Sequence, residues 1–334
     1  MSRAGLNRKS GLATLTLVLA AEAPDIDFIL FPLNRVEAFG LHRGFTHSIL
    51  YAPLTAAMAL AVVYGIHRWR LKRGKTTKIP VDWKWLYGFA LLAVLSHLLL
   101  DFTNNYGLRP FAPFDRHWYA WDIVFILEPL VTGPLALALL ASWFARLIGG
   151  EIGVRRPTMP GRAAAIVALA FVFTVWGARD YYHRRAVTLL EHELYQGAEP
   201  VKVSANPYPL DPFRWHGVVE TDNFFVTVPV NTWKEEVDPQ RDAVYRNKRE
   251  ETPISLAAKR SRLGQIYLDW ARYPYVEAEP LPDNRGWVVY FNDLRYAYPD
   301  RSTRCGFPVM SVELDPQLHV IDQTSGPRLE DCAD

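Results

Sequence analysis

Long apolar segments, almost free of charged side chains, dominate the first half of the chain and limit what it can fold into. Four approach or reach the length that a helix needs to cross a bilayer, about twenty residues, and a shorter one precedes them. They are residues 48–66, 85–100, 123–145, 163–178 and, the shorter one, 11–21. A soluble helical core could hold such segments too. Their repetition, with Trp and Tyr at several ends, favours a membrane bundle of about five transmembrane segments over residues 1–180.

The basic residues between the apolar segments predict the orientation of this bundle. They gather in two short loops, as Arg68, Arg70, Lys72, Arg73, Lys75 and Lys78, and as Arg146, Arg155, Arg156 and Arg162. Short loops rich in Lys and Arg stay in the cytoplasm, so both loops and the basic N-terminus are expected inside. Everything after about Asp180 is then expected outside, as a linker helix over residues 181–200 and a domain over 201–334.

The C-terminal part of the sequence predicts a small β-rich extracytoplasmic domain. Residues 217–230, 286–292 and 308–314 are short runs rich in β-branched and aromatic side chains, separated by proline-rich turns. His216 could lie on a binding face of this domain or in its packed core. Cys305 and Cys332 are the only cysteines, which excludes a cysteine-based zinc site and leaves a disulfide and two free thiols equally open.

With this orientation, the chemically active side chains of the first half fall on the outer face of the membrane. Each lies at the outer end of an apolar segment or in the loop beside one, and they are Asp25, Asp27, His42, His47, His97, Asp101 and Asp122. The expected fold could have scattered them over both faces. Their convergence therefore predicts one polar site at the outer face.

Three of these motifs have spacings that suit metal binding. His97 and Asp101 are four residues apart, on one face of a helix. Asp25 and Asp27 could both reach a metal pair from a kinked helix end, while Thr46 could cap a helix that starts at His47. Imidazole and carboxylate ligands suit zinc, manganese or iron without choosing between them. One or two such ions would lower the pKa of a bound water toward about 7 for hydrolysis of an ester or phosphoester.

Neighbouring charges have several interpretations. Arg43 could clamp an anionic substrate or pair with Asp25 or Asp27. Glu128 lies inside an apolar segment, where an acid is a functional candidate, but it could instead face the helix break at Pro129. Asp115 and His117 are expected at the surface. The chain has no Gly-x-Ser-x-Gly, phosphate-binding loop or His-Glu-x-x-His motif, and its net charge of +2 gives no reason to expect nucleic acid.

The motifs Ala-Pro-Asp25-Ile-Asp27, His42-Arg-Gly-Phe-Thr-His47-Ser and Ser-His97-Leu-Leu-Leu-Asp101-Phe resemble those of the inner-membrane metal-dependent hydrolases of the uncharacterised family 457 type. The resemblance covers about residues 10–145. It implies the bacterial inner membrane, a helix bundle with an additional C-terminal domain, and a metal site made of these residues with Asp122 at a matching acidic position. Members open with a short helix bearing a Thr-His pair, so we expect such a segment upstream of Met1.

The sequence thus predicts a membrane-bound, metal-dependent hydrolase acting on an ester or phosphoester of lipid or envelope origin. Asp25, Asp27 and His47 are the expected ligands and general bases, and Arg43 is expected to stabilise negative charge. Two other classes stay open. One is a transporter or ion-binding membrane protein, and the other is a non-catalytic envelope protein in which a metal only joins the helices.

Overall fold

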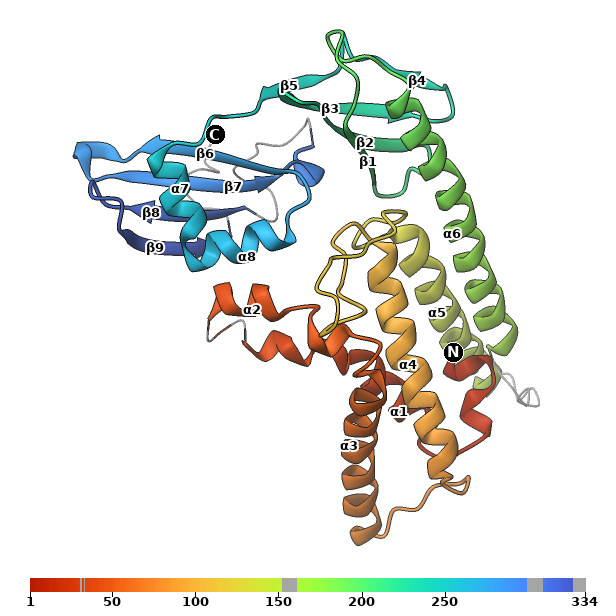
Figure 1. Cartoon of the computed structure of the whole chain (residues 1–334). Helices are drawn as coiled ribbons and strands as arrows, with labels where there is room; N and C mark the ends of the chain where they lie inside the picture. The colour runs from red at the N-terminus through yellow and green to blue at the C-terminus, as the bar shows by residue number, and fades with distance from the viewer. Residues whose placement is uncertain (31, 33, 152–160, 299–308, 327–334) are drawn as a thin grey trace. The chain divides into compact units, whose positions relative to one another are not determined.

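Helices form the N-terminal part of the chain and antiparallel strands most of the remainder (Figure 1). This computed structural model describes residues 1–30, 32, 34–151, 161–298 and 309–326. The chain divides into two units. The first comprises Met1–Phe28 and His42–Asp180, and the second comprises Ile29–Leu41 and the described residues from Tyr181 onward. Both cysteines, Cys305 and Cys332, lie outside the described residues.

Two described helices are long and apolar enough to cross a membrane by themselves, α4 (Trp83–Thr103) and α6 (Arg162–Glu191). A third span exists if the bent pair Arg35–His47 and Ala52–Lys72 is one broken segment. The apolar helix α1 (Ala13–Glu22) is shorter. The N-terminal region is therefore helical with two to three candidate spans.

The helix bounds differ from those of the apolar segments for local reasons. Helix α3 (Ala52–Lys72) starts later than residue 48, because the Ser48 hydroxyl binds the carbonyl oxygens of Pro110 and Ala112 and holds the chain in a loop. Helix α5 (Pro129–Glu151) starts later than residue 123. Its first residue is a proline, which suits the first position of a helix because no partner is needed there for the missing N–H.

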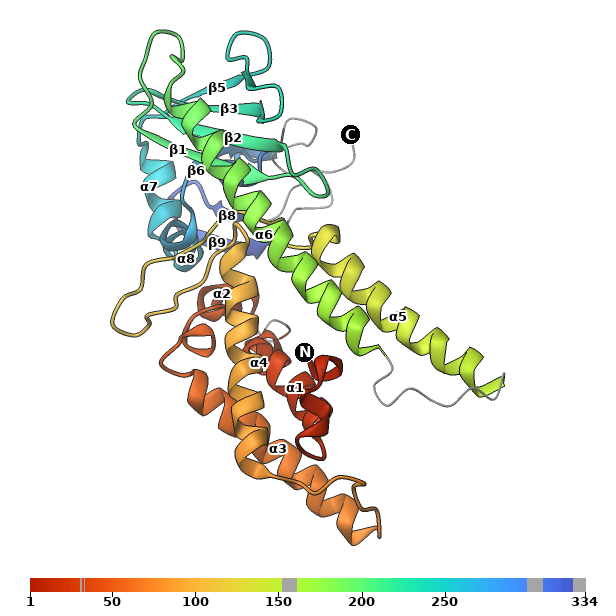
Figure 2. The same cartoon turned by 90° about the vertical axis from the view of Figure 1, so that its right-hand side faces the viewer.

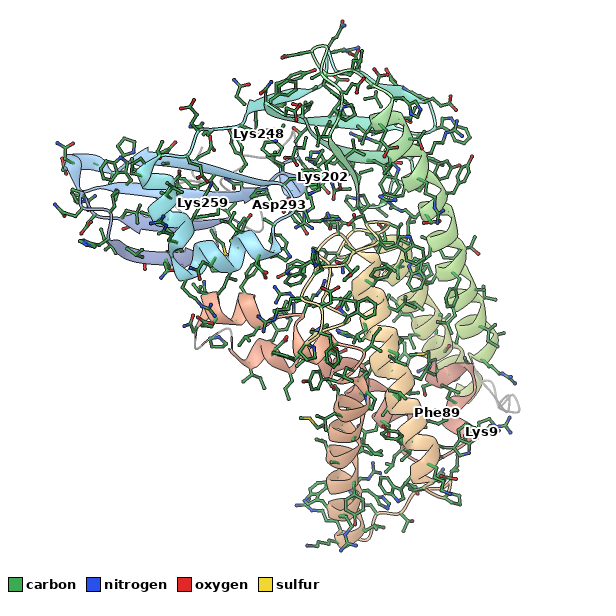
Figure 3. The ribbon with its side chains drawn as sticks, viewed as in Figure 1. Lys9, Phe89, Lys202, Lys248, Lys259 and Asp293 are labelled. Carbon is green, nitrogen blue, oxygen red and sulfur yellow. The ribbon has the colours of Figure 1, made fainter. Side chains whose placement is uncertain are left out.

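Helices α1, α3 and α4 pack through small side chains. Their shared core contains many alanines, among them Ala20, Ala56 and Ala90, which are fully buried, and Phe89 of α4 packs with them (Figure 3). Small residues let helix backbones approach closely, which is how helices associate in lipid. Asp82 fixes the start of α4, because its side chain accepts hydrogen bonds from two backbone N–H groups of the first turn.

The strands form two antiparallel sheets. One has the order β1-β2-β3-β4, with β5 also paired to β3, and the other has the order β6-β7-β8-β9. The strands of the first sheet are β1 (Lys202–Pro207), β2 (Arg214–Glu220), β3 (Phe224–Asn231), β4 (Glu236–Val237) and β5 (Val244–Asn247). Those of the second are β6 (Pro274–Pro280), β7 (Trp287–Asp293), β8 (Met310–Leu314) and β9 (Val320–Ser325). The expected β-rich C-terminal region is confirmed at this level.

Helices cover both sheets. The C-terminal end of α6 lies against the first sheet, where Ala186 and Leu190 enter its core, and this contact explains why α6 continues beyond the apolar segment (Figure 2). Gly217 of β2 makes the contact possible, since a Cβ there would lie 2.7 Å from a Leu190 methyl carbon. Helices α7 (Pro253–Arg260) and α8 (Arg262–Trp270) pack against the second sheet.

Two buried polar residues of the second unit, Asp293 and His216, have structural partners. Asp293, labelled in Figure 3, is fully enclosed and accepts hydrogen bonds from Arg295 and from the backbone N–H of Arg272. His216 is also fully buried, and its Nε2 donates to the carbonyl oxygen of Leu294 at 2.9 Å. Of the two interpretations of His216, the packed core is the one observed.

Candidate metal centre

Three separate segments of the first unit bring the sequence motifs together. Asp25 and Asp27 lie on the 3₁₀ helix η3 (Pro24–Leu30) that follows α1, and His47 ends the short 3₁₀ helix η4 (Phe45–His47). His97 and Asp101 lie one turn apart near the C-terminal end of α4. Each segment lies at or beside the end of a longer helix, and the polar side chains of the three segments meet there.

A first group consists of Asp25, His47, His97 and Asp101. Each offers one ligand atom, and these four atoms lie within 4.8 Å of one another. The Nε2 atoms of His47 and His97 are 3.2 Å apart. Oδ1 of Asp25 lies 3.2 Å and 3.6 Å from them, and Oδ2 of Asp101 lies 3.2 Å and 3.3 Å from them. Four atoms from three motifs therefore surround one point.

These spacings fit a tetrahedral metal ion. Ligands about 2.0–2.1 Å from a tetrahedral zinc lie about 3.3–3.4 Å from one another, which is close to the observed values. Oδ2 of Asp101 supports the same interpretation, because it is buried and has no aligned hydrogen bond within the described part of the chain. A buried acceptor in that state is costly unless another partner satisfies it. The donor set of two imidazoles and two carboxylates suits zinc, manganese or iron.

A second group shares one residue with the first. Asp25, Asp27 and His42 also present ligand atoms within 4.8 Å of one another. His42 Nδ1 lies 3.2 Å from Oδ1 of Asp27. Oδ2 of Asp27 accepts hydrogen bonds from the hydroxyl of Thr46 at 3.1 Å and from the backbone N–H of Arg43 at 3.3 Å. Asp25 therefore belongs to both groups.

Arg43 holds the site from one side. Its backbone is in the left-handed region, with φ 55°, which directs its N–H toward Asp27. Its guanidinium donates to Oδ1 of Asp101 at 2.6 Å and to the side-chain oxygen of Asn104 at 3.2 Å, and it stacks 4.7 Å from the ring of Tyr106. Its carboxylate partner is thus Asp101, whereas the sequence had suggested Asp25 or Asp27.

The neighbours of Asp25 stabilise its charged form. Partial burial by itself raises the pKa of a carboxyl group, but hydrogen bonds from His47 and His97 and their positive charge outweigh it and hold the pKa of Asp25 well below its usual range. Asp25 is therefore a carboxylate at neutral pH, the form that binds a cation.

The remaining candidates lie elsewhere in the first unit. Asp122 is buried but belongs to neither group found among the described residues. Asp115 and His117 contact each other at 3.2 Å, and the His117 side chain is 87% exposed. Glu128 is buried beside the start of α5, where it accepts from the N–H of Leu130 and pairs with Arg179 of α6 at 2.8 Å.

Sequence reasoning missed three contributors to the site. Thr46 binds Asp27 and lies 3.0 Å from Nδ1 of His47, where the sequence had suggested a helix cap. Asn104 and Tyr106 hold Arg43. The polar pair Asn104-Asn105 directly after the His97 motif is the one sequence signal that pointed to them.

An apolar pocket lies on the neighbouring face of α4. Its volume is about 400 Å³, and it is lined by Ile49, Leu95, Leu98, Leu99, Phe102, Leu108, Pro110, Phe111 and Tyr119. Leu98 and Phe102 directly follow His97 and Asp101 in sequence. The same two turns of helix therefore contribute to a polar site and to an apolar pocket.

The first half of the chain resembles known proteins. The sequence profile of the YdjM inner membrane protein family matches residues 2–184, which contain all three motifs. The protein YfhP of Bacillus subtilis, whose function is uncharacterised, is 31% identical over 143 residues. This alignment spans 43% of the present chain and 38% of YfhP. No solved structure matches the chain.

Proposed function

The chain belongs to the YdjM inner membrane protein family, and we propose that it is a membrane-bound, metal-dependent hydrolase. One observation carries the proposal: two histidines and two aspartates from three separate motifs direct one ligand atom each to a common point. Burying charged groups costs free energy unless the groups are paired or bind a metal. A bound metal would offset this cost for the four side chains.

Each residue of the site has a role in this proposal. Asp25, His47, His97 and Asp101 would hold a first metal, and Asp27 and His42 would form a second position with Asp25. When bound, the metal supplies Lewis acidity toward a water molecule and toward an oxygen of the substrate. Asp27 would take up the proton released from water, whereas the low pKa of Asp25 suits it to the role of ligand. Arg43 orients Asp101 and adds positive charge beside the reacting oxygen.

The apolar pocket beside the site favours a substrate of lipid origin. Its lining is apolar, and several lining residues belong to α4, a helix long and apolar enough to cross a membrane. An acyl chain in this pocket would place an ester or phosphoester group near His97 and Asp101, since Leu98 and Phe102 adjoin them. Envelope esters without such a chain gain nothing from the pocket, so a lipid-derived ester or phosphoester is the preferred substrate class.

We also propose about five transmembrane segments over residues 1–180, a linker helix over 181–200, and an extracytoplasmic β-rich domain over 201–334. The supporting feature is the pair α3 and α4. The basic residues of the loop that joins them lie at one end, while His47 precedes α3 and Asp101 ends α4 at the other. By the positive-inside rule the site then faces the outside of the bacterial inner membrane.

Two other functions predict different behaviour. A transporter would hold its ions near the middle of the bilayer, between inverted repeats. Here the ligands lie at helix ends and in 3₁₀ turns, which favours hydrolysis. A purely structural metal could bind the same ligands as a catalytic one, but this function would not explain the apolar pocket.

The test is metal analysis of the detergent-purified chain, followed by turnover of a panel of phosphodiesters and lipid esters. The expected result is stoichiometric zinc, manganese or iron and turnover in the wild type, both lost in His97→Ala. The matched control is His117→Ala, because His117 is exposed and outside both groups. Leu99→Trp, which fills the pocket, should lower turnover of long-chain esters more than that of short-chain ones.

The outcomes separate the alternatives. A wild-type chain that retains no metal after reconstitution would end the proposal. Bound metal without turnover of any ester would support the structural role. Equal loss of long-chain and short-chain turnover in Leu99→Trp would remove the acyl chain from the proposal while keeping the hydrolase.

A further inference from the structure

We propose that a groove between helices α1, α5 and α6 binds an acyl chain of an anionic phospholipid, with the phosphate group at Arg3. All residues that line the groove belong to the first unit. None of them lines the apolar pocket on α4, and none is a candidate metal ligand. The groove is therefore a separate site, and its occupant does not depend on the proposed hydrolase.

The groove has the length and the lining that an acyl chain needs, and its volume is about 620 Å³. One face of each helix lines it, through Leu17 and Ala21 of α1, Leu135 and Ala138 of α5, and Ala165 and Leu169 of α6. Along α1 the lining extends from Thr14 to Glu22, a rise of about 12 Å. The hydrocarbon of one leaflet is about 15 Å thick, half of the bilayer core. A single extended chain therefore matches the groove.

The packing of the helices explains why an occupant is favourable. Among the described residues, the core that α1 shares with α3 and α4 includes no side chain of α5 or α6. Val131 of α5 and Val172 and Trp176 of α6 instead pack around Ile123 and Val124. Helices associate in lipid through close van der Waals packing, and an unfilled gap forfeits those contacts. An acyl chain in the groove restores them between α1 and the other two helices.

Arg3 lies at one end of the groove. The hydroxyl oxygens of Ser2 and Thr14 are 2.7 Å apart, which places the N-terminal segment beside the first turn of α1. The N-terminus also lies beside α5 and α6 (Figures 1 and 2), and the Arg3 guanidinium donates to the carbonyl oxygen of Leu139 at 3.4 Å. A guanidinium has five N–H donors in a planar fork that matches phosphate oxygens, and this bond uses one of them. Arg3 can therefore bind the phosphate of a lipid whose chain fills the groove.

The distribution of charge gives the lipid a direction. A second cation lies near Arg3, since a Cβ at Gly5 would be 3.8 Å from Nε of Arg162, the first residue of α6. At the opposite end of the lining, the exposed side chain of Glu22 is an acid. An anionic headgroup is therefore attracted to the Arg3 end and repelled from the other. With the orientation proposed above, the Arg3 end lies in the cytoplasmic leaflet, where cations beside the membrane attract anionic lipids.

The experiment titrates the full chain in neutral detergent with phosphatidylglycerol, and with phosphatidylcholine of the same acyl chains, and counts bound lipid by native mass spectrometry. The expected result is one phosphatidylglycerol per chain at this site, bound more tightly than phosphatidylcholine. Arg3→Gln should lower the phosphatidylglycerol affinity about tenfold, the loss typical of a hydrogen bond between charged groups. Its matched control is Arg8→Gln, because Arg8 is exposed and does not line the groove.

A second pair of variants tests the acyl chain. Ala138→Phe fills the groove and should abolish this binding, whereas Ala136→Phe, at an exposed position of the same helix outside the lining, should not. Leu99→Trp fills the other pocket and should leave the groove lipid bound.

Several outcomes would overturn the lipid site. Equal losses in Arg3→Gln and Arg8→Gln would reduce the binding to general attraction by basic residues. Equal affinities for the two lipids would remove the anionic headgroup, and full affinity in Ala138→Phe would remove the acyl chain. A chain that dimerises without lipid, and loses the dimer in Ala138→Phe, would assign the groove to a second copy. If Ala138→Phe does not fold, Arg3→Gln and the comparison of the two lipids still decide the result.

Discussion

Arg43 donates a hydrogen bond of 2.6 Å to Oδ1 of Asp101, and Oδ2 of the same carboxylate lies 3.2 Å from Nε2 of His47. One carboxylate oxygen is thus held by a fixed cation while the other is presented to the candidate metal. Carboxylates that bind metals are commonly oriented in this way by a partner outside the metal's own ligands.

Arg43→Ala should therefore weaken metal binding without removing a ligand. We expect a fall of about 10–100-fold in Zn²⁺ affinity, the range typical of partners that orient ligands. Arg43→Lys keeps the charge but loses the planar fork, so it should recover part of the affinity. Arg116→Ala, which removes an exposed cation from the loop after α4, is the control. Equal affinities in wild type and Arg43→Ala would show that Asp101 does not need its partner.

Asp25 should control both metal positions, because it belongs to both groups of ligand atoms. If two ions bind, Asp25→Asn should lower the stoichiometry at both positions, whereas His97→Ala and His42→Ala should each remove one. Metal analysis of the three purified variants after identical reconstitution checks this. A His42→Ala variant that retains all the metal of the wild type would reduce the centre to a single ion held by the first group.

The sequence predicted the ligand cluster because the relevant signals are local. His97 and Asp101 share a helical face through their spacing, and loop charges alone predict that the three motifs lie on one side of a membrane. The apolar segment 85–100, recognised from its local composition, falls within α4. Periodicity and charge distribution carry such information without any knowledge of tertiary structure.

The features that the sequence did not reveal depend on distant contacts. The salt bridge between Glu37 and Arg262 joins residues 225 positions apart, and nothing in either local pattern indicates it. The ion-pair partner of Arg43 is another distant contact. Asp25, Asp27 and Asp101 are all carboxylates of the predicted site, and only the folded structure shows that Asp101 is the partner. The ion pair of Glu128 is also a distant contact, because its partner Arg179 lies in another helix.

The buried pair of Glu128 and Arg179 should matter for stability and not for metal binding. Both side chains are almost fully buried, so Glu128→Gln leaves the Arg179 charge without its carboxylate at a cost of about 3–5 kcal/mol. Thermal unfolding in detergent should show a clear drop, while metal retention in the folded fraction should match the wild type. Glu128→Gln combined with Arg179→Met removes both charges and should recover much of the loss. Lost metal in the folded single variant would instead place Glu128 in the function of the site.

His216 should make the first sheet sensitive to mild acid. Burial lowers the pKa of His216 to about 4, which the hydrogen bond to Leu294 only partly offsets and the nearby charge of Arg246 reinforces. The unfolded chain, with a histidine pKa near 6.5, binds the proton more readily, so stability is full above about pH 6.5 and falls as the pH drops toward 4. The total effect is roughly 3 kcal/mol. Hydrogen exchange of peptides covering β2, corrected for intrinsic rates and compared at pH 7 and pH 5, should show lower protection at pH 5. His216→Gln should flatten this dependence, and His319→Gln, whose side chain is 80% exposed, should not. An unchanged pH dependence in His216→Gln would assign the acid sensitivity to another group.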